Sequence, residues 1–410
     1  MNTSATDPVV IVDGARTPMG SFQGDLSAVT APELGAISIK GALERAGVSA
    51  NDIEEVVMGC VLPAGMGQAP ARQASLGAGL PQESGCTTIN KMCGSGMKAV
   101  MFAHDQLLAG SATTMVAGGL ESMSNAPYLL PKVRDGLRMG HGEVKDHMFL
   151  DGLEDAYEPG KLMGHFAEKT ATRYQFTREA QDEFAITSLK RAQAAMDSGA
   201  FATEIKAVNV KTRKGEHEVL LDEQPPKANF DRIPTLRPAF DKDGTVTAAN
   251  ASSISDGAAA VVMMRMSEAE KRGLTPRARI IAHTSHAHAP EWFTTAPVNA
   301  LEKLFAKIGK KAADVDLYEI NEAFAVVTMA AMHEHGLPHD KVNVYGGACA
   351  LGHPVGASGA RIIVTLMNAL ERHDVNLGVA SLCIGGGEAT AVAIERLSCC
   401  LLYTSPSPRD

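Results

Sequence analysis

The chain has 410 residues, of which 45% are hydrophobic and 21% charged, and its 38 basic and 47 acidic side chains give a formal net charge of −9. This composition is typical of a folded globular protein and excludes collagen, a long coiled coil and an intrinsically disordered chain. The acidic balance, without a cluster of lysine and arginine, predicts no nucleic-acid partner and no membrane partner, because both need a basic surface.

The two ends of the chain and its cysteines bear on where the protein works. Residues 1–7 contain neither the basic segment nor the apolar segment of a secretory signal, so a cytoplasmic location is expected. The seven cysteines show neither a CxxC pair nor the spacing of a zinc site, which predicts free thiols and no metal centre. Residues 400–410 resemble the translation of a sequencing adapter, so residues 398–410 are predicted to be a non-native tail.

Strand-like and helix-like segments alternate through the first part of the chain. In order they are a β-branched run at Val9–Val12 bounded by Asp13-Gly14, a helical pattern at Leu34–Ala46 that stops at Gly47, a strand at 53–58, a helix at 97–108 and a strand at 115–117. This alternation predicts a layered α/β fold with largely parallel strands.

The second half of the chain repeats the order of the first. Residues 43–57 and 305–319 each run from a helix through a glycine to an aspartate and then a strand, at a constant offset of 262 residues. Residues 96–100 and 359–363 match at an offset of 263. Two duplicated α/β halves explain both matches more simply than coincidence between generic helices.

A segment of different composition separates the halves. Residues 121–243 are rich in charge, proline and methionine and contain one clear amphipathic helix, Arg178–Ser198, with Thr177 as its N-cap. Such an insertion either covers a ligand or is a structural appendage. We therefore predict an N-terminal domain of residues 1–120 and 244–275, a loop domain of residues 121–243 and a C-terminal domain of residues 276–397.

Two segments carry a potential nucleophile and base. Cys93 lies where small residues give way to a helix, and backbone N–H groups at a helix start lower the pKa of a thiol, which favours the thiolate. His353 lies amid small residues and precedes Pro354, which places its ring on a loop, and imidazole is a natural partner for a thiol. Taken singly, Cys93 could equally fill space in a tight turn, and His353 could be a solvated loop residue.

Two further segments combine strand ends with glycine or polar residues. Three glycines, residues 385–387, follow Cys383 closely, and their N–H groups form either an oxyanion hole or a plain turn between strands. Asn321-Glu322 stands where a strand ends and a helix starts, which is where open α/β sheets bind ligands. Taken alone, this last segment is better explained by Asn321 capping the helix and Glu322 complementing its dipole.

Together the four segments resemble the active-site blocks of the thiolase family, in the family's order. They are NKMCGSGM at 90–97, NEAFA at 321–325, GHPVGASG at 352–359 and CIGGG at 383–387. The resemblance spans about residues 8–397 and implies a thiolase-like fold, with two duplicated layered α/β domains plus an inserted loop domain. It also implies a homo-oligomer, either a dimer or a tetramer.

The resemblance implies a reversible Claisen condensation of two acetyl-CoA to acetoacetyl-CoA and CoA, with thiolysis of short 3-oxoacyl-CoA as the reverse. Cys93 then carries the acyl group as a thioester, His353 activates it, and Cys383 is the acid/base at the methyl carbon. One oxyanion hole would consist of His353 and a water held by Asn321, and another of the N–H groups of Cys93 and Gly385. No metal is implied, and no cofactor beyond CoA as substrate and product.

Further matches to the family suggest contacts with the pantetheine arm of CoA. These residues are Ser252, Phe240, Ala323 and Phe324, with Leu153 and Met163 from the loop domain. Core packing explains the larger apolar ones equally well, and a turn or cap explains the serine. Two departures from the family fall near the substrate mouth: Pro225-Pro226-Lys227 stands where many biosynthetic members carry an arginine, and Leu162 where acetoacetyl-specific members commonly have a histidine.

Other functions are weighed against this one. A 3-oxoacyl-CoA thiolase of fatty-acid β-oxidation, with a preference for longer chains, would share the same blocks. A decarboxylating 3-oxoacyl synthase lacks the second cysteine, so Cys383 argues against it. A non-catalytic acyl-CoA-binding protein would not need the complete set of Cys93, Asn321, His353 and Cys383, and a papain-like hydrolase has no local motif here.

Overall fold

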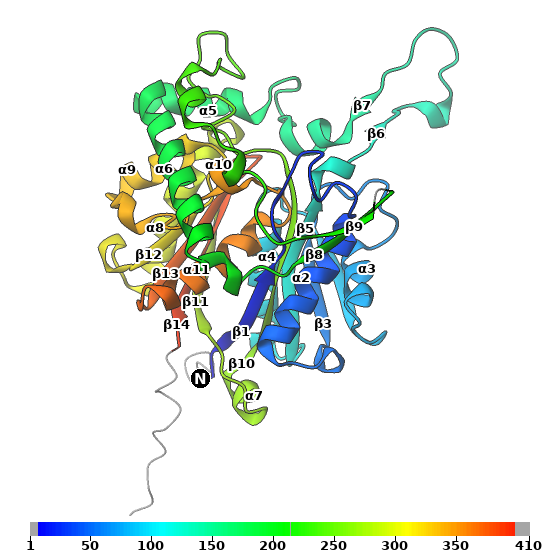
Figure 1. Cartoon of the computed structure of the whole chain (residues 1–410), viewed down its shortest axis with the longest axis vertical. Helices are drawn as coiled ribbons and strands as arrows, with labels where there is room; N and C mark the ends of the chain where they lie inside the picture. The colour runs from blue at the N-terminus through cyan, green and yellow to red at the C-terminus, as the bar shows by residue number, and fades with distance from the viewer. Residues whose placement is uncertain (1–6, 214, 398–410) are drawn as a thin grey trace, which may run out of the picture.

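Hydrogen bonds join ten strands into one sheet within residues 7–213 and 215–397, which are the residues that the computed structural model describes (Figure 1). The predicted tail at residues 398–410 lies outside them. The half of the sheet from the N-terminal part of the chain contains β1 (Val9–Arg16), β3 (Glu55–Gly59), β4 (Gly85–Ile89), β5 (Thr114–Ser122) and β10 (Ser255–Arg265), in the order β4-β3-β5-β10-β1, with β2 (Gly20–Ser21) beside β10.

The other half of the sheet has the same topology. It contains β11 (Ala278–Ala287), β12 (Leu317–Ile320), β13 (Leu377–Ile384) and β14 (Glu388–Arg396), in the order β12-β13-β14-β11. Parallel pairing of β12 with β13 corresponds to that of β3 with β5, and a parallel bridge from Tyr318 to Val342 stands where β4 pairs with β3 in the first half. The predicted duplication of the fold is therefore confirmed, while the exact domain boundaries stay a prediction.

The sheet is mixed, so the expectation of largely parallel strands is wrong. Only β3 with β4, β3 with β5 and β12 with β13 are parallel among the described strand pairs of this sheet. The glycine turn at 385–387 returns the chain directly from β13 to β14, and a connection that short can only join antiparallel strands. The two halves meet where β1 pairs with β11, also antiparallel.

The first strand is longer than its sequence pattern predicts. β1 continues through Asp13-Gly14 to Arg16, with a bulge between Ile11 and Asp13. Arg277 donates to the Asp13 carboxylate at 2.8 Å, which allows the charge to lie within the strand. Other expected elements are confirmed: α2 (Ala31–Ala46) ends at Gly47 in the left-handed conformation, and Thr177 accepts from the backbone N–H of Ala180 at the start of α6 (Arg178–Asp197).

Helices form layers on both faces of the sheet. α2 packs on β1, β5 and β10 of the first half, and α8 (Ala296–Ile308) packs on β11, β13 and β14 of the second. Between the two halves lie α4 (Ser95–Ala109) and α11 (Ser358–Arg372), which contact each other and strands from both halves. The remaining helices are α3 (Pro70–Gly77), α7 (Met266–Lys271), α9 (Ala325–His335) and α10 (Ala348–Leu351).

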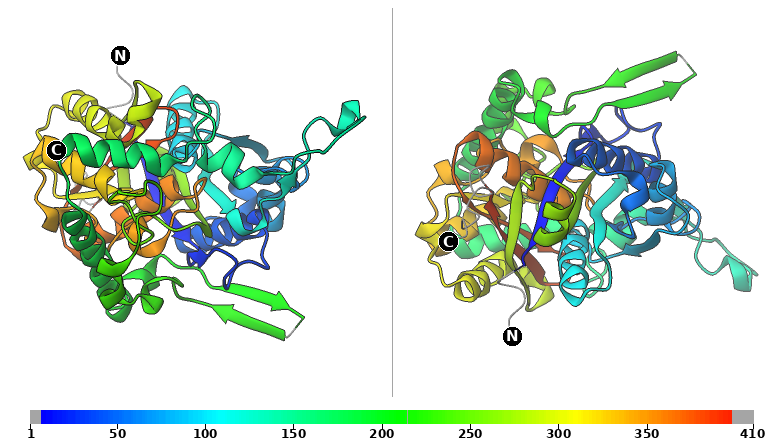
Figure 2. Two further views of the ribbon diagram at one scale, coloured as in Figure 1. Left: turned by 90° about the horizontal axis from the view of Figure 1, so that it is seen from above. Right: turned by 90° about the horizontal axis from the view of Figure 1, so that it is seen from below.

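The insertion lies over one end of these layers. Its helix α5 (Met163–Tyr174) lies near the top of Figure 1, and both α5 and α6 contact α9. Two hairpins extend from the body of the molecule in different directions (Figure 2): β6 (Tyr128–Leu129) with β7 (Lys145–Asp146), and β8 (Val208–Thr212) with β9 (Gly215–Val219). None of the described helices is long and apolar enough to cross a membrane.

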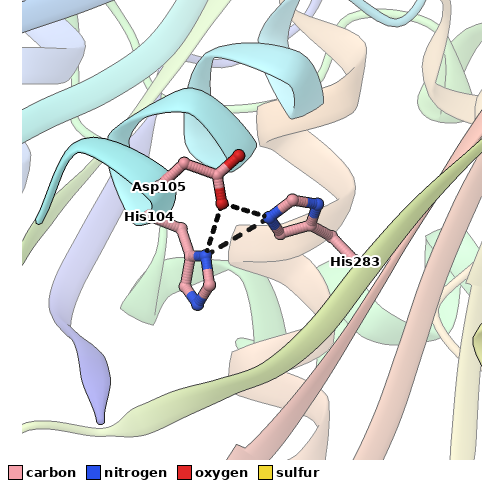
Figure 3. Close-up of side chains that lie close together, drawn as sticks. All are labelled: His104, Asp105 and His283. Carbon is pink, nitrogen blue, oxygen red and sulfur yellow. Dashed lines mark hydrogen bonds and ion pairs between the residues drawn. The ribbon is translucent and has the colours of Figure 1, made fainter. Parts of the chain in front are cut away.

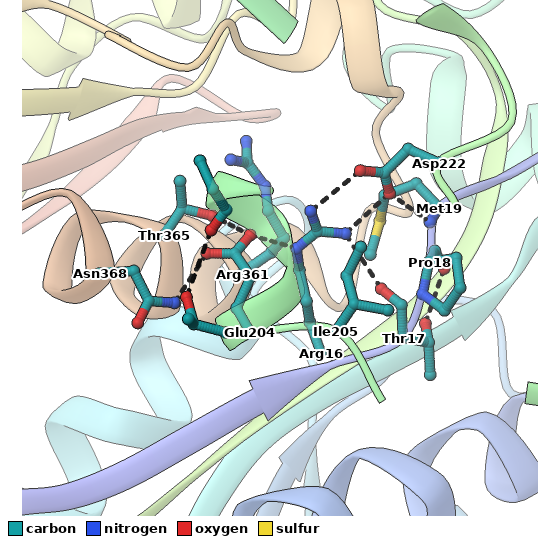
Figure 4. A network of polar contacts seen from close by, with 12 residues as sticks. Arg16, Thr17, Pro18, Met19, Glu204, Ile205, Asp222, Arg361, Thr365 and Asn368 are labelled. Atoms are coloured by element: carbon teal, nitrogen blue, oxygen red, sulfur yellow. Dashed lines mark hydrogen bonds and ion pairs between the residues drawn. The ribbon is translucent and has the colours of Figure 1, made fainter. Parts of the chain in front are cut away.

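A buried ion network ties the insertion to both halves of the fold (Figure 4). Arg16 at the end of β1 donates to both oxygens of Asp222 at 2.7 and 2.9 Å and to Glu204 at 2.5 Å. Glu204 also accepts from Thr365 and Asn368 of α11 at 3.1 and 2.8 Å. The three charged side chains are fully buried, so each depends on its partners for the solvation it has lost.

Replacing Arg16 with alanine should strongly destabilise the protein, because it leaves two buried carboxylates without their cation. We expect the free energy of unfolding to fall by about 3–5 kcal/mol, measured by urea denaturation. Lys211→Ala, which breaks the exposed pair with Glu216, should cost less than about 1 kcal/mol. Equal losses for the two variants would contradict the importance assigned to the buried network.

Candidate active site

Cys93 lies between β4 and α4, in a tight turn. Met92 before it has a φ of +46°, a left-handed conformation that is uncommon for a residue with a side chain, and Gly94 after it is the N-cap of α4. Burial raises the pKa of the Cys93 thiol to about 11, even though the backbone N–H groups of Gly385 and of Cys93 itself act in the opposite direction. The expectation of a lowered pKa is therefore wrong, because desolvation of the sulfur outweighs the helix start.

His353 lies in the loop between α10 and α11. Its Nδ1 lies 2.5 Å from the hydroxyl of Ser358, and the same hydroxyl lies 3.1 Å from the carbonyl oxygen of Pro354. Assigning the single hydroxyl proton to the bond with Pro354 makes Nδ1–H of His353 the donor to Ser358 and leaves the lone pair on Nε2. Nε2 is buried without a hydrogen-bond partner, and burial, together with the charge of Arg361, lowers the pKa of His353 to about 3. The ring is thus a neutral base.

Cys383 and the three glycines after Ile384 form the end of β13 and its turn. Cys383 is fully buried, and burial raises the pKa of its thiol well above the ordinary value, with neighbouring Cys93 acting in the same direction. Gly387 has a φ of +86°, and a Cβ there would lie 2.3 Å from the carbonyl oxygen of His288. The turn therefore requires glycine, and it brings the N–H of Gly385 to the sulfur of Cys93.

Asn321 follows β12 and does not cap a helix. Both polar atoms of its side chain are buried without a hydrogen-bond partner, whereas α9 begins four residues later at Ala325. Glu322 does not face the start of α9 either, because it accepts hydrogen bonds from Ser188, Asn343 and the backbone N–H of Cys349. The capping explanation of this segment is wrong, and the unpaired amide of Asn321 remains available to bind a water or a ligand.

Sequence reasoning missed Glu121, which supports the loop that carries His353. Its buried carboxylate accepts from the backbone N–H groups of Val61, Leu62 and Gly356 at 2.9, 3.1 and 2.9 Å. Burial raises the pKa of Glu121 to about 7. Glu121 lies near the end of β5, and no local pattern indicates its role, because its partners are 59, 60 and 235 positions away in the chain.

A cavity of about 360 Å³ brings most of the predicted residues together. Its wall includes Cys93, His353 and Gly385 and all of the residues predicted to contact pantetheine: Ser252, Phe240, Ala323, Phe324, Leu153 and Met163. Asn321 and Cys383 are not in its wall; both are buried, and Cys383 belongs to the same apolar cluster as Ala323 and Phe324.

The cavity wall also contains residues for which the sequence predicted no role. Phe149, Ile254 and Phe293 are apolar, and in the sequence they are indistinguishable from core residues, while Val355 lies within the GHPVGASG block without an assigned role. Phe240 stands against Phe324, with ring centroids 6.0 Å apart, and a Cβ on Gly164 would lie 2.2 Å from the Phe240 ring. Because Gly164 has no side chain, the ring of Phe240 can pack directly against its backbone.

The pKa values predict how Cys93 reacts with an alkylating reagent. A thiol whose pKa is about 11 remains protonated at neutral pH, so the reactive thiolate becomes more abundant as pH rises. The rate of alkylation by iodoacetamide should increase about tenfold per pH unit between about pH 7 and pH 10. Peptide mapping assigns the adduct, with Cys93→Ala as the control. A rate that is constant between about pH 6 and pH 8 would instead indicate a resting thiolate–imidazolium pair.

The chain matches models of two thiolase domains along almost its whole length. The model of the N-terminal thiolase domain matches residues 9–267, and that of the C-terminal domain matches residues 274–396. An acetyl-CoA acetyltransferase of Thiocystis violacea is 49% identical over 394 residues, covering 96% of this chain and 100% of that protein. The acetyl-CoA acetyltransferase of Escherichia coli strain K12 is 51% identical over 392 residues, covering 95% and 99%.

Solved structures agree with these matches. The Acat5 thiolase from Ascaris suum, crystallised in complex with coenzyme A, is 42% identical, with a TM-score of 0.90 over 95% of this chain and 100% of that chain. The acetyl-CoA acetyltransferase of Bacillus anthracis is 40% identical, with a TM-score of 0.93 over 95% and 99%. The chain therefore belongs to the thiolase family.

Proposed function

We propose that the chain catalyses the reversible Claisen condensation of two acetyl-CoA to acetoacetyl-CoA and CoA, and the thiolysis of short 3-oxoacyl-CoA. The observation that carries the proposal is the convergence of Cys93, the unprotonated Nε2 of His353 and the N–H of Gly385 on one cavity. The similarity to acetyl-CoA acetyltransferases of two bacteria supports this reaction.

The first step is formation of an acyl-enzyme. His353 Nε2 accepts the proton of the Cys93 thiol as the sulfur attacks the thioester carbonyl, so the nucleophile becomes charged only when substrate is present. The carbonyl oxygen gains negative charge, which the N–H groups of Cys93 and Gly385 stabilise. The bond to CoA then breaks, and the departing sulfur takes the proton from His353.

The second step forms or breaks the carbon–carbon bond. In condensation, the thiolate form of Cys383 removes a proton from the methyl carbon of a second acetyl-CoA, and the enolate carbon attacks the acetyl group on Cys93. The bond from the acetyl carbon to the Cys93 sulfur then breaks, and the released Cys93 thiolate takes up the proton held by Cys383. In thiolysis, the Cys93 sulfur attacks the 3-oxo carbonyl, the carbon–carbon bond breaks, and the Cys383 thiol gives its proton to the enolate carbon. The raised pKa of Cys383 suits this second direction, because the resting thiol holds the proton to be donated. A water held by Asn321 stabilises the enolate oxygen, and His353 adds to this stabilisation when its Nε2 carries a proton.

CoA would enter along the apolar wall of the cavity. The pantetheine arm lies against Phe240, Phe324, Leu153 and Met163, and the hydroxyl of Ser252, which donates to the carbonyl of Ala323 at 2.9 Å, retains acceptor capacity for its amides. A second cavity of about 340 Å³ shares Ala248 with the first. Lys227 and Arg232 in its wall offer positive charge to the phosphates of the nucleotide end.

Acetoacetyl-CoA is the favoured 3-oxoacyl substrate in this proposal. Phe293, Leu162 and Val355 contribute bulk to the cavity wall, and bulk there favours short acyl groups. A longer-chain enzyme of fatty-acid β-oxidation is the alternative, and a comparison of rates on acetoacetyl-CoA and on a longer 3-oxoacyl-CoA distinguishes the two. The homo-oligomeric state, the cytoplasmic location and a role in fatty acid metabolism stay predictions.

Incubation with acetyl-CoA should acetylate Cys93. Intact mass spectrometry is expected to find one acetyl group per chain, mapped to the peptide that contains Cys93, and addition of free CoA should remove it. Cys93→Ala should acquire none. If the folded wild-type protein remains unmodified, the acyl-enzyme mechanism fails and a non-catalytic acyl-CoA-binding protein becomes the better explanation.

Replacing Cys383 with alanine should separate the two steps. We expect thiolysis of acetoacetyl-CoA to fall by at least about 10²-fold, because the acid/base is lost, while acetylation of Cys93 by acetyl-CoA continues. Cys86→Ala is the matched control, since Cys86 is a free thiol on β4 outside the cavity wall, and it should retain wild-type rates. Undiminished thiolysis by Cys383→Ala would refute its role.

A further inference from the structure

Two histidines and an aspartate from different halves of the fold converge away from the active site (Figure 3). His104 and Asp105 lie in the middle of α4, within the N-terminal thiolase match, and His283 lies on β11, within the C-terminal match. None of the three lines the catalytic cavity, and the proposed reaction uses none of them. In the described part of the chain this is the only group of three or more potential metal-ligating side chains whose ligand atoms lie within 4.8 Å of one another.

The three ligand atoms form a nearly regular triangle. His104 Nδ1 lies 3.1 Å from Asp105 Oδ1 and 3.2 Å from His283 Nε2, and His283 Nε2 lies 2.9 Å from the same Asp105 oxygen. Ligands 2.0–2.1 Å from a tetrahedral zinc ion are about 3.3 Å apart, and ligands on one face of an octahedral ion of similar size are about 3.0 Å apart. The triangle therefore has the size of one face of a metal coordination shell.

The surroundings suit a cation that enters from solvent. The two imidazole side chains are mostly buried, at 12% and 13% exposure, whereas the carboxylate of Asp105 is 55% exposed. The rings are thus held in place while one side remains accessible to water. Lys307 donates to the backbone carbonyl of His283 at 3.1 Å, and Lys98 lies near Asp105; these positive charges lower the affinity for a cation.

We propose that His104, Asp105 and His283 form a binding site for one divalent transition-metal ion, with Zn²⁺ as the best fit. Two imidazoles and a carboxylate suit Zn²⁺ and its neighbours in the first transition row better than Mg²⁺ or Ca²⁺, which prefer oxygen ligands alone. Because α4 and β11 belong to different halves, the ion cross-links the two halves through side chains. Its role is structural, so the proposal is independent of the proposed function.

The test uses the full chain after removal of metal with a chelator. Isothermal titration with Zn²⁺ should find one site per chain, and Zn²⁺ should raise the melting temperature. Asp105→Asn and His283→Ala should each weaken binding at least about tenfold, with circular dichroism to check that each variant folds. The matched control is His286→Ala, because His286 lies on the same strand with neither ring nitrogen paired and points to the opposite face. It should bind Zn²⁺ like the wild type.

Co²⁺ identifies the ligands directly. Bound at the proposed site, it should show visible d–d bands without a strong sulfur-to-metal charge-transfer band in the near ultraviolet. Such a band would indicate binding at Cys93 or Cys383 instead and would overturn the proposal. Equal Zn²⁺ affinity of wild type and Asp105→Asn would overturn it as well, since this half-exposed side chain can be changed without disturbing the fold.

Discussion

Gly96 and Gly359 let the N-terminal ends of α4 and α11 contact each other backbone to backbone. A Cβ on Gly96 would lie 2.8 Å from the backbone nitrogen of Ala360, and a Cβ on Gly359 would lie 2.3 Å from that of Met97. The two contacts are equivalent under the offset of 263 residues that relates the halves. Cys93 precedes the first glycine by three residues and His353 precedes the second by six, so one contact positions both the proposed nucleophile and the proposed base.

Burial then sets the charge state of the pair. Desolvation raises the pKa of Cys93 and lowers that of His353, so both are neutral at rest. A buried thiolate–imidazolium pair would pay a desolvation penalty in the absence of substrate, whereas a neutral pair does not. The N-terminal ends of two helices meet beside the cavity and favour negative charge there. The charge that these dipoles stabilise is consequently the one that develops on the thioester oxygen during the reaction.

Local sequence patterns predicted the structural features that are set by residues close together in the chain. The end of α2 at Gly47 and the cap of α6 at Thr177 follow from residues a few positions apart, and the four blocks carry the family resemblance. What sequence reasoning missed depends on long-range contacts: the antiparallel pairs of the sheet, the support that Glu121 gives to the 352–359 loop, and the burial that reverses the shift expected for Cys93. The group of His104, Asp105 and His283 also depends on a long-range contact, because His104 and His283 are 179 positions apart.

The duplicated frame explains why the chemistry is divided between the halves. An offset of 263 residues pairs Cys93 with Gly356 and pairs His353 with Asn90, so each half has an equivalent loop but carries only one of these two side chains. Neither half alone can place the proposed base, His353, beside the proposed nucleophile, Cys93, because the two come together only when α4 and α11 pack together. Interactions that keep the two halves in their relative positions therefore affect the proposed reaction, although they do not contact substrate. The Arg16 network, which joins β1 and the insertion to α11, is one such interaction, and a metal ion between α4 and β11 would be another.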